Sequence, residues 1–528
     1  MKKNIILSTA LMAMCAMNVQ AGGLLTNSNQ NAAFLRNFAQ EGQITLTSLY
    51  ANPAGNAFLC KGWHVSLNSQ TAYQERSIET NFPLFQLNNA NKNATHTFIG
   101  KAKAPVIPSF TVSHNWDRWS LSAHFALVGG GGKCEFDKGL GSFEALYANT
   151  MNSMVPGVVN ATINPMMPMV QANVQQTVAG QISGALQGAG MPAASADATA
   201  ASLAASGTYT ATPASKLTGY DMNAYMKGNS YYFGLQVGAS YKISDNVSAY
   251  LGVRGIYATC NYNGYVQDIH ANYVAAADYT YNVPANPGAG FPGVAGTGTS
   301  VLSTGSESLS DNELTLNCDQ TGFGLAPIVG LDWMINKHWN VAIKYEAAAR
   351  LSLKNKTEMN DFAKAQAADP TSALNAYQDG KKVRSDVPAI LAIGAEYSPI
   401  EKVRIDASFK TYFEKSAADR DKMDDLGNTL EACLGVEYDA HKLITLSASW
   451  QSTNYNMKDA YFNDLSFNLS SNSLGVGVRL HPSKLFNIDL GYMHTFYQER
   501  NVSSLGGLKN DKYNRKNKVF GIGFNFAI

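Results

Sequence analysis

One repeated construction dominates this sequence: an alternating segment, a short polar turn and a second alternating segment. It occurs six times, and a much longer connection follows each time. Strict alternation of short and long connections is typical of an up-and-down transmembrane β-barrel, with turns on one side of the membrane and loops on the other. The six turns are 115–118, 244–246, 336–338, 400–402, 439–442 and 482–484.

The alternation within each segment predicts two unlike faces. After the turn at 439–442, Ile444, Leu446 and Trp450 alternate with Thr445 and Ser447. Successive side chains of a strand point to opposite faces, so one face is apolar and the other is polar or small. Alternation alone does not separate a soluble sandwich from a membrane barrel, because both hide one face from water.

The amino terminus favours the barrel. Lys2 and Lys3 precede an apolar run at 5–17, and Val19-Gln20-Ala21 follows it, which predicts a secretory signal peptide over residues 1–21. Cys15 lacks the small preceding residue of a lipoprotein signal. No later stretch approaches the roughly 18 apolar residues of a membrane helix. The exported chain is therefore expected in the outer membrane of a Gram-negative cell, spanning it with strands.

The pattern predicts an all-β fold with a 14-stranded antiparallel transmembrane β-barrel over residues 61–528, and 133–228 and 263–312 as its longest extracellular loops. An even number of strands leaves both barrel ends on one side, and short turns are normally periplasmic. The predicted strands are 62–78, 104–114, 119–130, 230–243, 247–262, 313–334, 339–354, 386–398, 403–415, 428–438, 443–456, 468–481, 486–498 and 517–528.

Composition excludes several other functions. A net charge of +1 without a basic aromatic cluster does not favour nucleic acid. No G-x-S-x-G elbow, H-E-x-x-H helix or P-loop occurs, so no enzyme activity, cofactor or metal is predicted. The cysteines lack CxxC spacing. Cys260 and Cys318 flank one long loop, so they either form a disulfide or remain separate buried thiols.

A segment at 22–60 precedes the first strand and is too long for a simple lead-in. It is rich in apolar residues and contains Asn52-Pro53-Ala54, and the chain closes with Phe-Gly-Ile-Gly-Phe-Asn-Phe at 520–526. With the signal and the strand count, these features resemble the FadL family of outer-membrane long-chain fatty acid transporters, which includes toluene and xylene channels. The resemblance implies that residues 22–60 form a hatch inside the barrel.

The third predicted strand ends in four consecutive glycines, Gly129, Gly130, Gly131 and Gly132. Glycines weaken strand pairing and permit bulges. Members of the resembled family are thought to release a hydrophobic ligand sideways through a kink in the third strand, and these glycines match that place. The alternative is a flexible exit from the strand into a long loop.

The loop at 133–228 is unusually apolar. A helix is predicted at 174–189, and Pro156, Pro165 and Pro168 are expected to interrupt any longer one. Because methionine adapts to irregular ligands, we predict an apolar capture loop; the alternative is a lid without a ligand. In the resembled family the capturing helices are expected in the next loop, which is Gly/Pro/Ser-rich here. The methionines are Met151, Met154, Met166, Met167 and Met169.

Strand parity points several charged residues into the lumen. A lumen cation is able to hold a ligand carboxylate by a charge-assisted hydrogen bond, and the alternative is an ion-pair ladder that ties hatch to wall. The resembled family places a basic residue on the fifth strand where this sequence has Thr259, which weakens the case for a fatty acid. The candidate cations are Arg254, Lys344, Arg350, Arg404 and Lys410.

The predicted function is passive, hatch-gated transport of hydrophobic molecules, such as long-chain fatty acids, with lateral release near the third strand. Two alternatives remain open: an outer-membrane scaffold or shuttle of the same fold, and a general porin. The predicted partners are the hydrophobic ligand, outer-membrane lipid and lipopolysaccharide, and the protein is expected to be a monomer.

Overall fold

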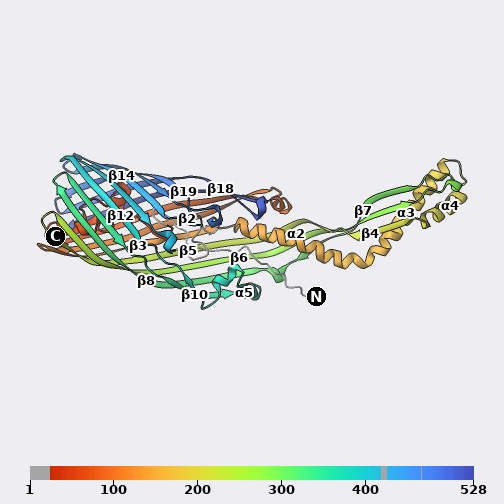
Figure 1. The fold of residues 1–528 in the computed structure, drawn as a ribbon, viewed down its shortest axis with the longest axis horizontal. Coiled ribbons are helices and arrows are strands. Elements are labelled where there is room, and N and C mark those ends of the chain that lie inside the picture. Colours follow the sequence, from red (N-terminus) through yellow and green to blue (C-terminus); the bar gives the residue numbers. More distant parts are fainter. Residues whose placement is uncertain (1–23, 418–424, 465–466) are drawn as a thin grey trace.

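The computed structural model describes residues 24–417, 425–464 and 467–528; the predicted signal peptide lies outside them. Within this part, fourteen antiparallel strands form a closed barrel whose last strand pairs with the first (Figure 1). The predicted fold class is confirmed. The barrel strands are β1 (Gly62–Asn81), β2 (Thr95–Asn115), β3 (Trp119–Phe136), β5 (Lys216–Lys242), β6 (Val247–Val283), β8 (Leu314–Asn336), β9 (Trp339–Glu346), β12 (Ile390–Ile400), β13 (Val403–Tyr412), β14 (Thr429–His441), β15 (Ile444–Asn454), β16 (Ser471–Ser483), β17 (Phe486–Tyr497) and β19 (Lys509–Ala527).

Several strands are longer than predicted, and the largest extensions are at the end away from the short turns. β5 begins at Lys216 instead of 230, and β6 continues to Val283 instead of 262. Parts of both predicted long loops are therefore strand. Once a strand leaves the lipid, its outer face needs no apolar residue, so the period-two signal disappears while the ladder continues.

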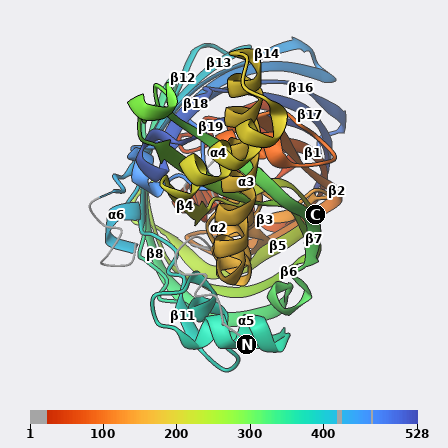
Figure 2. The same cartoon turned by 90° about the vertical axis from the view of Figure 1, so that its right-hand side faces the viewer.

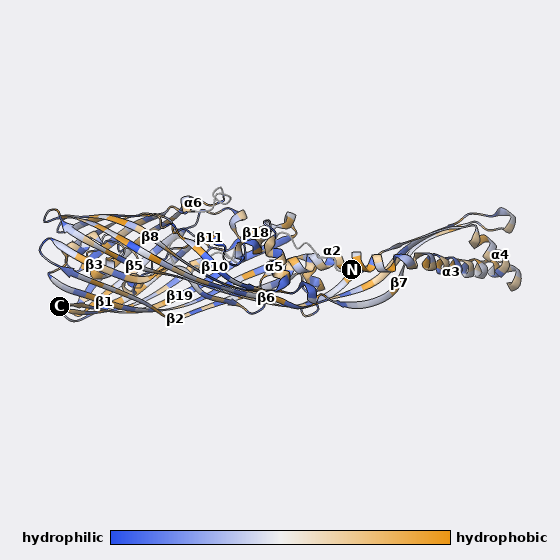
Figure 3. Cartoon of the chain, turned by 90° about the horizontal axis from the view of Figure 1, so that it is seen from below, coloured by the Kyte–Doolittle hydropathy of each residue, from blue (hydrophilic) through white to orange (hydrophobic). Residues whose placement is uncertain are grey.

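The outer face of the barrel is apolar along its middle and aromatic at one end. Leu325, Val329 and Leu331 on β8 are about half exposed, and hydrophobic positions recur along the barrel strands in Figure 3. A belt of exposed tryptophans marks the short-turn end, as expected where a barrel meets a membrane interface. The barrel therefore spans the outer membrane. The belt consists of Trp63, Trp116, Trp119, Trp333 and Trp339.

A long projection extends from the other end of the barrel (Figure 1). We call residues 164–213 and 270–308 the arm. β6 is the central strand of its sheet, with β4 on one side and β7 on the other. At about 3.3 Å per residue, the 37 residues of β6 reach roughly 120 Å, far more than an apolar band of about 25 Å requires. Its other elements are α3 (Met167–Gly188), α4 (Ala193–Ala205), β4 (Thr208–Pro213) and β7 (Val294–Ser308).

Helix α2 (Gly141–Ile163) begins at the mouth of the barrel and runs outward along the long axis of the molecule toward the arm (Figure 1); seen from the arm side, it lies in front of the barrel opening (Figure 2). It continues through Pro156, so that predicted interruption was wrong, whereas Pro165 lies in the turn before α3 and Pro168 in its first turn. No helix among the described residues is long and apolar enough to cross a membrane. The remaining elements are α1 (Ala32–Arg36), α5 (Asp361–Ala368), α6 (Glu414–Ala417), β10 (Ser352–Met359), β11 (Lys382–Arg384) and β18 (Arg500–Ser504).

Candidate functional site

The segment before the first strand lies inside the barrel. From residue 24 to residue 58 every residue is buried or half-buried, although the segment has only three short helical turns. Local side chains satisfy its backbone: Asn31 caps α1, and Thr45 and Ser48 form a reciprocal capping box. We call residues 24–58 the inner segment; its role as a hatch belongs to the proposal below.

Wall glycines let α1 pack directly on the barrel backbone. A Cβ atom placed on Gly491 or Gly521 would lie 2.7 Å from side-chain atoms of Leu35, and one on Gly475 would lie 2.6 Å from the Leu35 carbonyl oxygen. These glycines are on three successive strands, β16, β17 and β19. Any side chain at these positions forces α1 to move, so the glycines form a seat for the inner segment.

Two ion clusters join the inner segment to the wall. Lys410 Nζ on β13 lies 3.1 Å from Glu41 Oε1 in the inner segment and 2.8 Å from Glu431 Oε1 on β14. Arg36 of α1 lies 2.9 Å from both Glu437 on β14 and Asp489 on β17. All these side chains are at least 95 % buried, so each charge depends on its partner.

Tyr50 of the inner segment lies between two wall cations. The Arg254 guanidinium is 4.4 Å from its ring centre and Lys344 Nζ is 4.2 Å from it. Arg254 Nη1 also donates to Glu346 Oε1 at 2.6 Å, and Lys344 Nζ donates to the Tyr50 carbonyl oxygen at 2.6 Å. The arrangement combines cation–π contacts with charge-assisted hydrogen bonds.

The Asn52-Pro53-Ala54 motif binds a different part of the wall. The Asn52 amide donates to Gln43 O at 3.1 Å and to Asp332 on β8, and its oxygen accepts from Gly55 N at 3.0 Å. Ser240 on β5 and Ser248 on β6 donate to the carbonyl oxygens of Pro53 and Ala54, at 2.9 and 2.7 Å. The motif is therefore a docking turn of the inner segment.

The predicted lumen cations divide into two groups. Arg254, Lys344 and Lys410 are buried in the lumen with the partners given above, and Arg404 is partly exposed and paired with Glu437 and Asp439. The ion-pair alternative thus describes their contacts, while a ligand role stays a prediction. Arg350 was wrongly placed: the ladder stops after Glu346, the alternation shifts by one residue, and Arg350 is exposed.

The glycines that end the regular part of β3 lie at a break in the wall. β2 and β3 pair from Asn115↔Ser120 to Phe110↔Phe125 and again only at Lys101↔Glu135 and Gly100↔Phe136. The unpaired part of β2 contains Pro105 and Pro108, which have no N–H to donate. Gly130 and Gly132 have positive φ angles, 86° and 63°, and β3 shifts register against β5 there. The glycines lie within β3, which continues to Phe136, so they are not a flexible exit into a loop; their role in a lateral opening stays a prediction.

The inner segment covers the unpaired edge of β3 from inside. Asn27 N donates to Val128 O at 2.9 Å, Asn27 Nδ2 donates to Leu127 O at 3.1 Å, and Gly130 N donates to Leu25 O at 3.2 Å. A Cβ on Gly129 would lie 2.0 Å from Leu25 O. The glycine run thus permits a close approach that replaces part of the missing β2 ladder.

A cavity of about 250 Å³ lies at this gap. It joins Asn27 of the inner segment to side chains on the outer surface of the barrel, and Phe125 and Phe233 stack with ring centres 6.3 Å apart. Its lining is mainly apolar, which suits the end of a hydrophobic molecule. The principal lining residues are Asn27, Pro105, Pro108, Phe125, Leu127 and Phe233.

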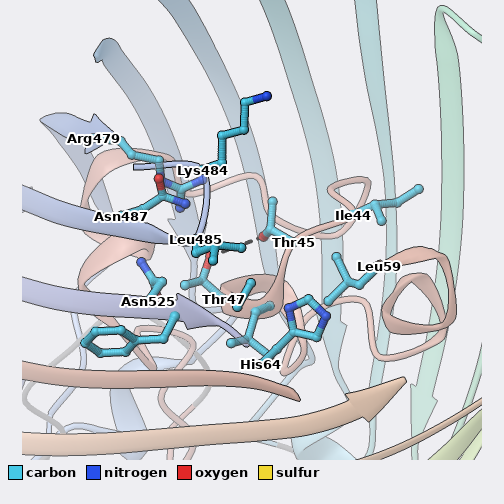
Figure 4. Close-up of a pocket in the computed structure, with 13 residues that line it drawn as sticks. Ile44, Thr45, Thr47, Leu59, His64, Arg479, Lys484, Leu485, Asn487 and Asn525 are labelled. Atoms are coloured by element: carbon cyan, nitrogen blue, oxygen red, sulfur yellow. Dashed lines mark hydrogen bonds between the residues drawn. The ribbon is translucent and has the colours of Figure 1, made fainter. Parts of the chain in front are cut away.

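A second cavity, of about 210 Å³, lies at the short-turn end below the inner segment (Figure 4). Thr45 and Thr47 border it on one side, and Arg479 and Asn525 on the other. Arg479 already forms a two-bond contact with Asp489, at 2.8 and 3.0 Å. The lining of this cavity is about equally polar and apolar, so it suits a hydrophobic molecule less well than the cavity at the gap.

The five predicted capture-loop methionines do not form one groove. Met151 is buried in the core at the barrel mouth and Met167 is buried where α3 begins, whereas Met166 and Met169 are exposed and Met154 is half-buried. Glu144 fastens α2 to the mouth: its carboxylate accepts from Tyr220 Oη at 2.9 Å and lies 2.9 Å from His96 Nδ1. A ligand-capturing role for these methionines stays a prediction.

No disulfide joins Cys260 and Cys318, and both thiols are buried. Cys260 lies opposite Gln320, and Cys318 opposite Tyr262, so the two cysteines are diagonal neighbours. Diagonal pairs are roughly 7–8 Å apart, beyond the span of an unstrained disulfide. The described residues also contain no group of three or more His, Cys, Asp or Glu side chains able to hold a metal ion.

Comparison with known proteins supports the fold. No family model matches this sequence, and no curated protein matches it significantly. A Pseudomonas aeruginosa FadL homologue has a similar structure, with a TM-score of 0.55, 14 % identity, and coverage of 96 % of this chain and 100 % of that one. The Pseudomonas putida toluene transporter TodX (TM-score 0.49, 10 % identity, 97 % and 100 % coverage) and the Ralstonia pickettii toluene transporter TbuX (0.46, 9 %, 92 % and 94 %) also match. The chain shares the FadL-like barrel fold.

Proposed function

We propose that this protein transports hydrophobic molecules, long-chain fatty acids or compounds of similar character, passively across the outer membrane. In this proposal the inner segment is the hatch, and the gap between β2 and β3 is the lateral exit. The observation that carries the proposal is the 250 Å³ apolar cavity, which joins the inner segment to the lipid-facing surface through an unpaired stretch of wall. A hydrophobic molecule leaving there enters the bilayer without crossing water.

Three further observations support the proposal. The two prolines of β2 and the glycines of β3 leave the gap without a ladder to break. The structural likeness to a FadL homologue supports the same barrel architecture. The inner segment occupies the lumen, which argues against the general-porin alternative because a porin needs a continuous water channel.

The test fills the gap. Ala104→Trp places a large ring in the cavity between β2 and β3. We expect uptake of radiolabelled oleic acid or toluene by a strain with only this transporter to fall at least tenfold, because the ring occupies the exit. Leu121→Trp is the matched control: it adds the same ring to a lipid-facing position of β3 outside the gap, and uptake is expected to stay unchanged.

Two results would contradict the proposal. If deletion of the gene causes no loss of uptake across a panel of long-chain acids and aromatic hydrocarbons, the proposed transport function is contradicted. If the Ala104→Trp variant is correctly inserted and its uptake is normal, only the proposed lateral exit is contradicted. The two parts of the proposal are thus tested separately.

A further inference from the structure

The arm presents a regular array of hydroxyl groups on one face of its sheet. Thr210 on β4, Thr280 on β6 and Thr297 on β7 lie directly opposite one another across three strands, and all three are exposed. The neighbouring rows are also exposed and polar or small. They consist of Thr208, Asn282 and Ala295 on one side, and Thr212, Asp278 and Thr299 on the other. We call these three rows the threonine face.

The opposite face of the same sheet is packed and holds the array rigid. Tyr281 and Tyr279 on β6 lie over Gly296 and Gly298 on β7; a Cβ on either glycine would be 2.5–2.6 Å from the tyrosine oxygen. These tyrosines also pack against the core that includes α3 and α4. An aromatic ring over a cross-strand glycine is a known way to pin register. The spacing of the threonine rows is thereby set.

Side chains within the array already share hydrogen bonds. The hydroxyl oxygens of Thr210 and Thr280 are 2.6 Å apart, and Thr299 Oγ1 donates to Asp278 Oδ1 at 2.6 Å. A hydroxyl has one donor and two acceptor sites, so each threonine keeps capacity for a partner in water. A shallow hollow of about 480 Å³ runs over the array, between Thr208, Thr280 and Thr297.

The whole arm lacks cations. It contains no lysine or arginine, and its only carboxylates are Asp197, Asp278 and Glu307. Exposed sheet usually carries charges, which keep strands from adding to one another. The barrel follows this rule, because Glu79 and Glu75 on β1 lie opposite Lys512 and Lys516 on the exposed face of β19. Exposed β-sheet in this protein is therefore able to carry charged side chains, and the lack of lysine and arginine is a particular property of the arm.

We propose that the threonine face binds a neutral polysaccharide. Rows of hydroxyls with one amide and one carboxylate match the donors and acceptors of sugar hydroxyl groups, and the threonine methyl groups match the apolar faces of sugar rings. Anionic glycans, including the phosphorylated core of lipopolysaccharide, need cations that the arm does not have. The strand length places this face far outside the membrane, where extracellular glycans are accessible. The proposal does not depend on transport.

The test uses the full-length protein in detergent micelles and three insoluble neutral polysaccharides: cellulose, chitin and starch granules. The wild type is expected to be depleted from solution by at least one of them, with little dependence on salt. In the triple variant Thr210→Val, Thr280→Val, Thr297→Val, the bound fraction is expected to fall at least tenfold, because valine keeps the shape and strand preference of threonine but removes the hydroxyl.

Two controls separate binding from folding. Thr162→Val with Thr177→Val changes exposed threonines on α2 and α3 whose hydroxyls donate to their own helix backbone, at 3.0 and 2.9 Å, and binding is expected to persist. A Thr→Ser triple at the threonine face keeps the hydroxyls and is expected to bind.

Several outcomes overturn the proposal. These are equal retention of wild type and valine triple, no retention on any of the three polysaccharides, or retention only on an anionic glycan with strong salt dependence. Sedimentation that reveals a dimer lost in the valine triple, without polysaccharide binding, would assign the face to a second copy of the chain instead.

Discussion

The inner segment and the arm use charge in opposite ways. The inner segment is enclosed, yet Arg36 and Glu41 connect it to buried charges on the wall. The arm is surrounded by water and contains no lysine or arginine. Burying a charge is costly unless the group is paired. The paired charges therefore hold the inner segment in one position, and loss of either partner is expected to destabilise it. The arm has no such network, and its exposed face is free to meet a neutral partner.

The glycines of the barrel wall beside the inner segment and those of the arm also have different surroundings. On the wall, Gly475, Gly491 and Gly521 touch α1, and any Cβ there meets the inner segment. On α3, a Cβ added to Gly180 or Gly184 meets nothing within 4 Å. One residue type therefore marks close packing in one region and open surface in the other. The comparison predicts that equal substitutions have very unequal effects.

Removal of the Lys410 charge is expected to have the largest effect on the position of the inner segment. Lys410→Met leaves Glu41 and Glu431 buried without their cation, at a cost of about 3–5 kcal/mol. We expect the inner segment to lose protection in hydrogen–deuterium exchange and the protein to conduct ions in planar bilayers. Exposed Lys512, paired with Glu499, supplies the control Lys512→Met, which is expected to change neither measurement. Full protection in Lys410→Met would contradict the ion-cluster role.

Leucine in place of a seat glycine is expected to have the next largest effect. Gly491→Leu forces α1 away from the wall, and overpacking of this kind costs about 1–3 kcal/mol. The expected result is faster amide exchange at Phe34 and Leu35 and lower resistance to thermal unfolding. Gly184→Leu in the arm adds the same side chain where nothing is close, and stability is expected to stay equal or rise, since leucine favours a helix more than glycine does. If the two variants change stability equally, the proposed difference in packing between the glycine seat and the arm is contradicted.

The smallest expected effect is a pH dependence at the start of the inner segment. Leu24 N donates to Glu414 Oε1 at 2.5 Å, and burial raises the pKa of the Glu414 carboxyl to about 7 from its ordinary 4.5. The closed state therefore binds the proton more tightly than an open state with Glu414 in water. Opening becomes easier as pH rises from about 4.5 to about 7, and changes little above that.

We expect a several-fold increase in opening at residues 24–27 over this range, measured by hydrogen exchange after correction for the intrinsic rate. Glu414→Gln removes the titrating group, and its exchange is expected to be independent of pH. A wild-type profile that is flat, or that runs in the opposite direction, would show that Glu414 does not control this contact.

Much of the barrel could be predicted from local pattern. Lys344, Arg404 and Lys410 lie in the lumen because two-residue alternation continues through their strands. Arg350 failed because the chain leaves its ladder after Glu346, and alternation carries no information across an interruption. The arm was missed for a related reason: beyond the membrane the outer face of a strand needs no apolar residue, so the continuation of β5 and β6 shows no regular alternation and resembles a loop.

The sequence by itself determined the class of the molecule: an exported chain of alternating strands with one face for lipid, a leading segment, and a glycine run in the third strand. These features depend on neighbouring residues. Only the tertiary structure decided that Lys410 pairs with both Glu41 and Glu431. It also decided that the Leu25 carbonyl accepts a hydrogen bond from β3 where β2 is unpaired, and that three threonines from β4, β6 and β7 form one row. Such contacts depend on strand register and join residues distant in sequence, which no local periodicity encodes.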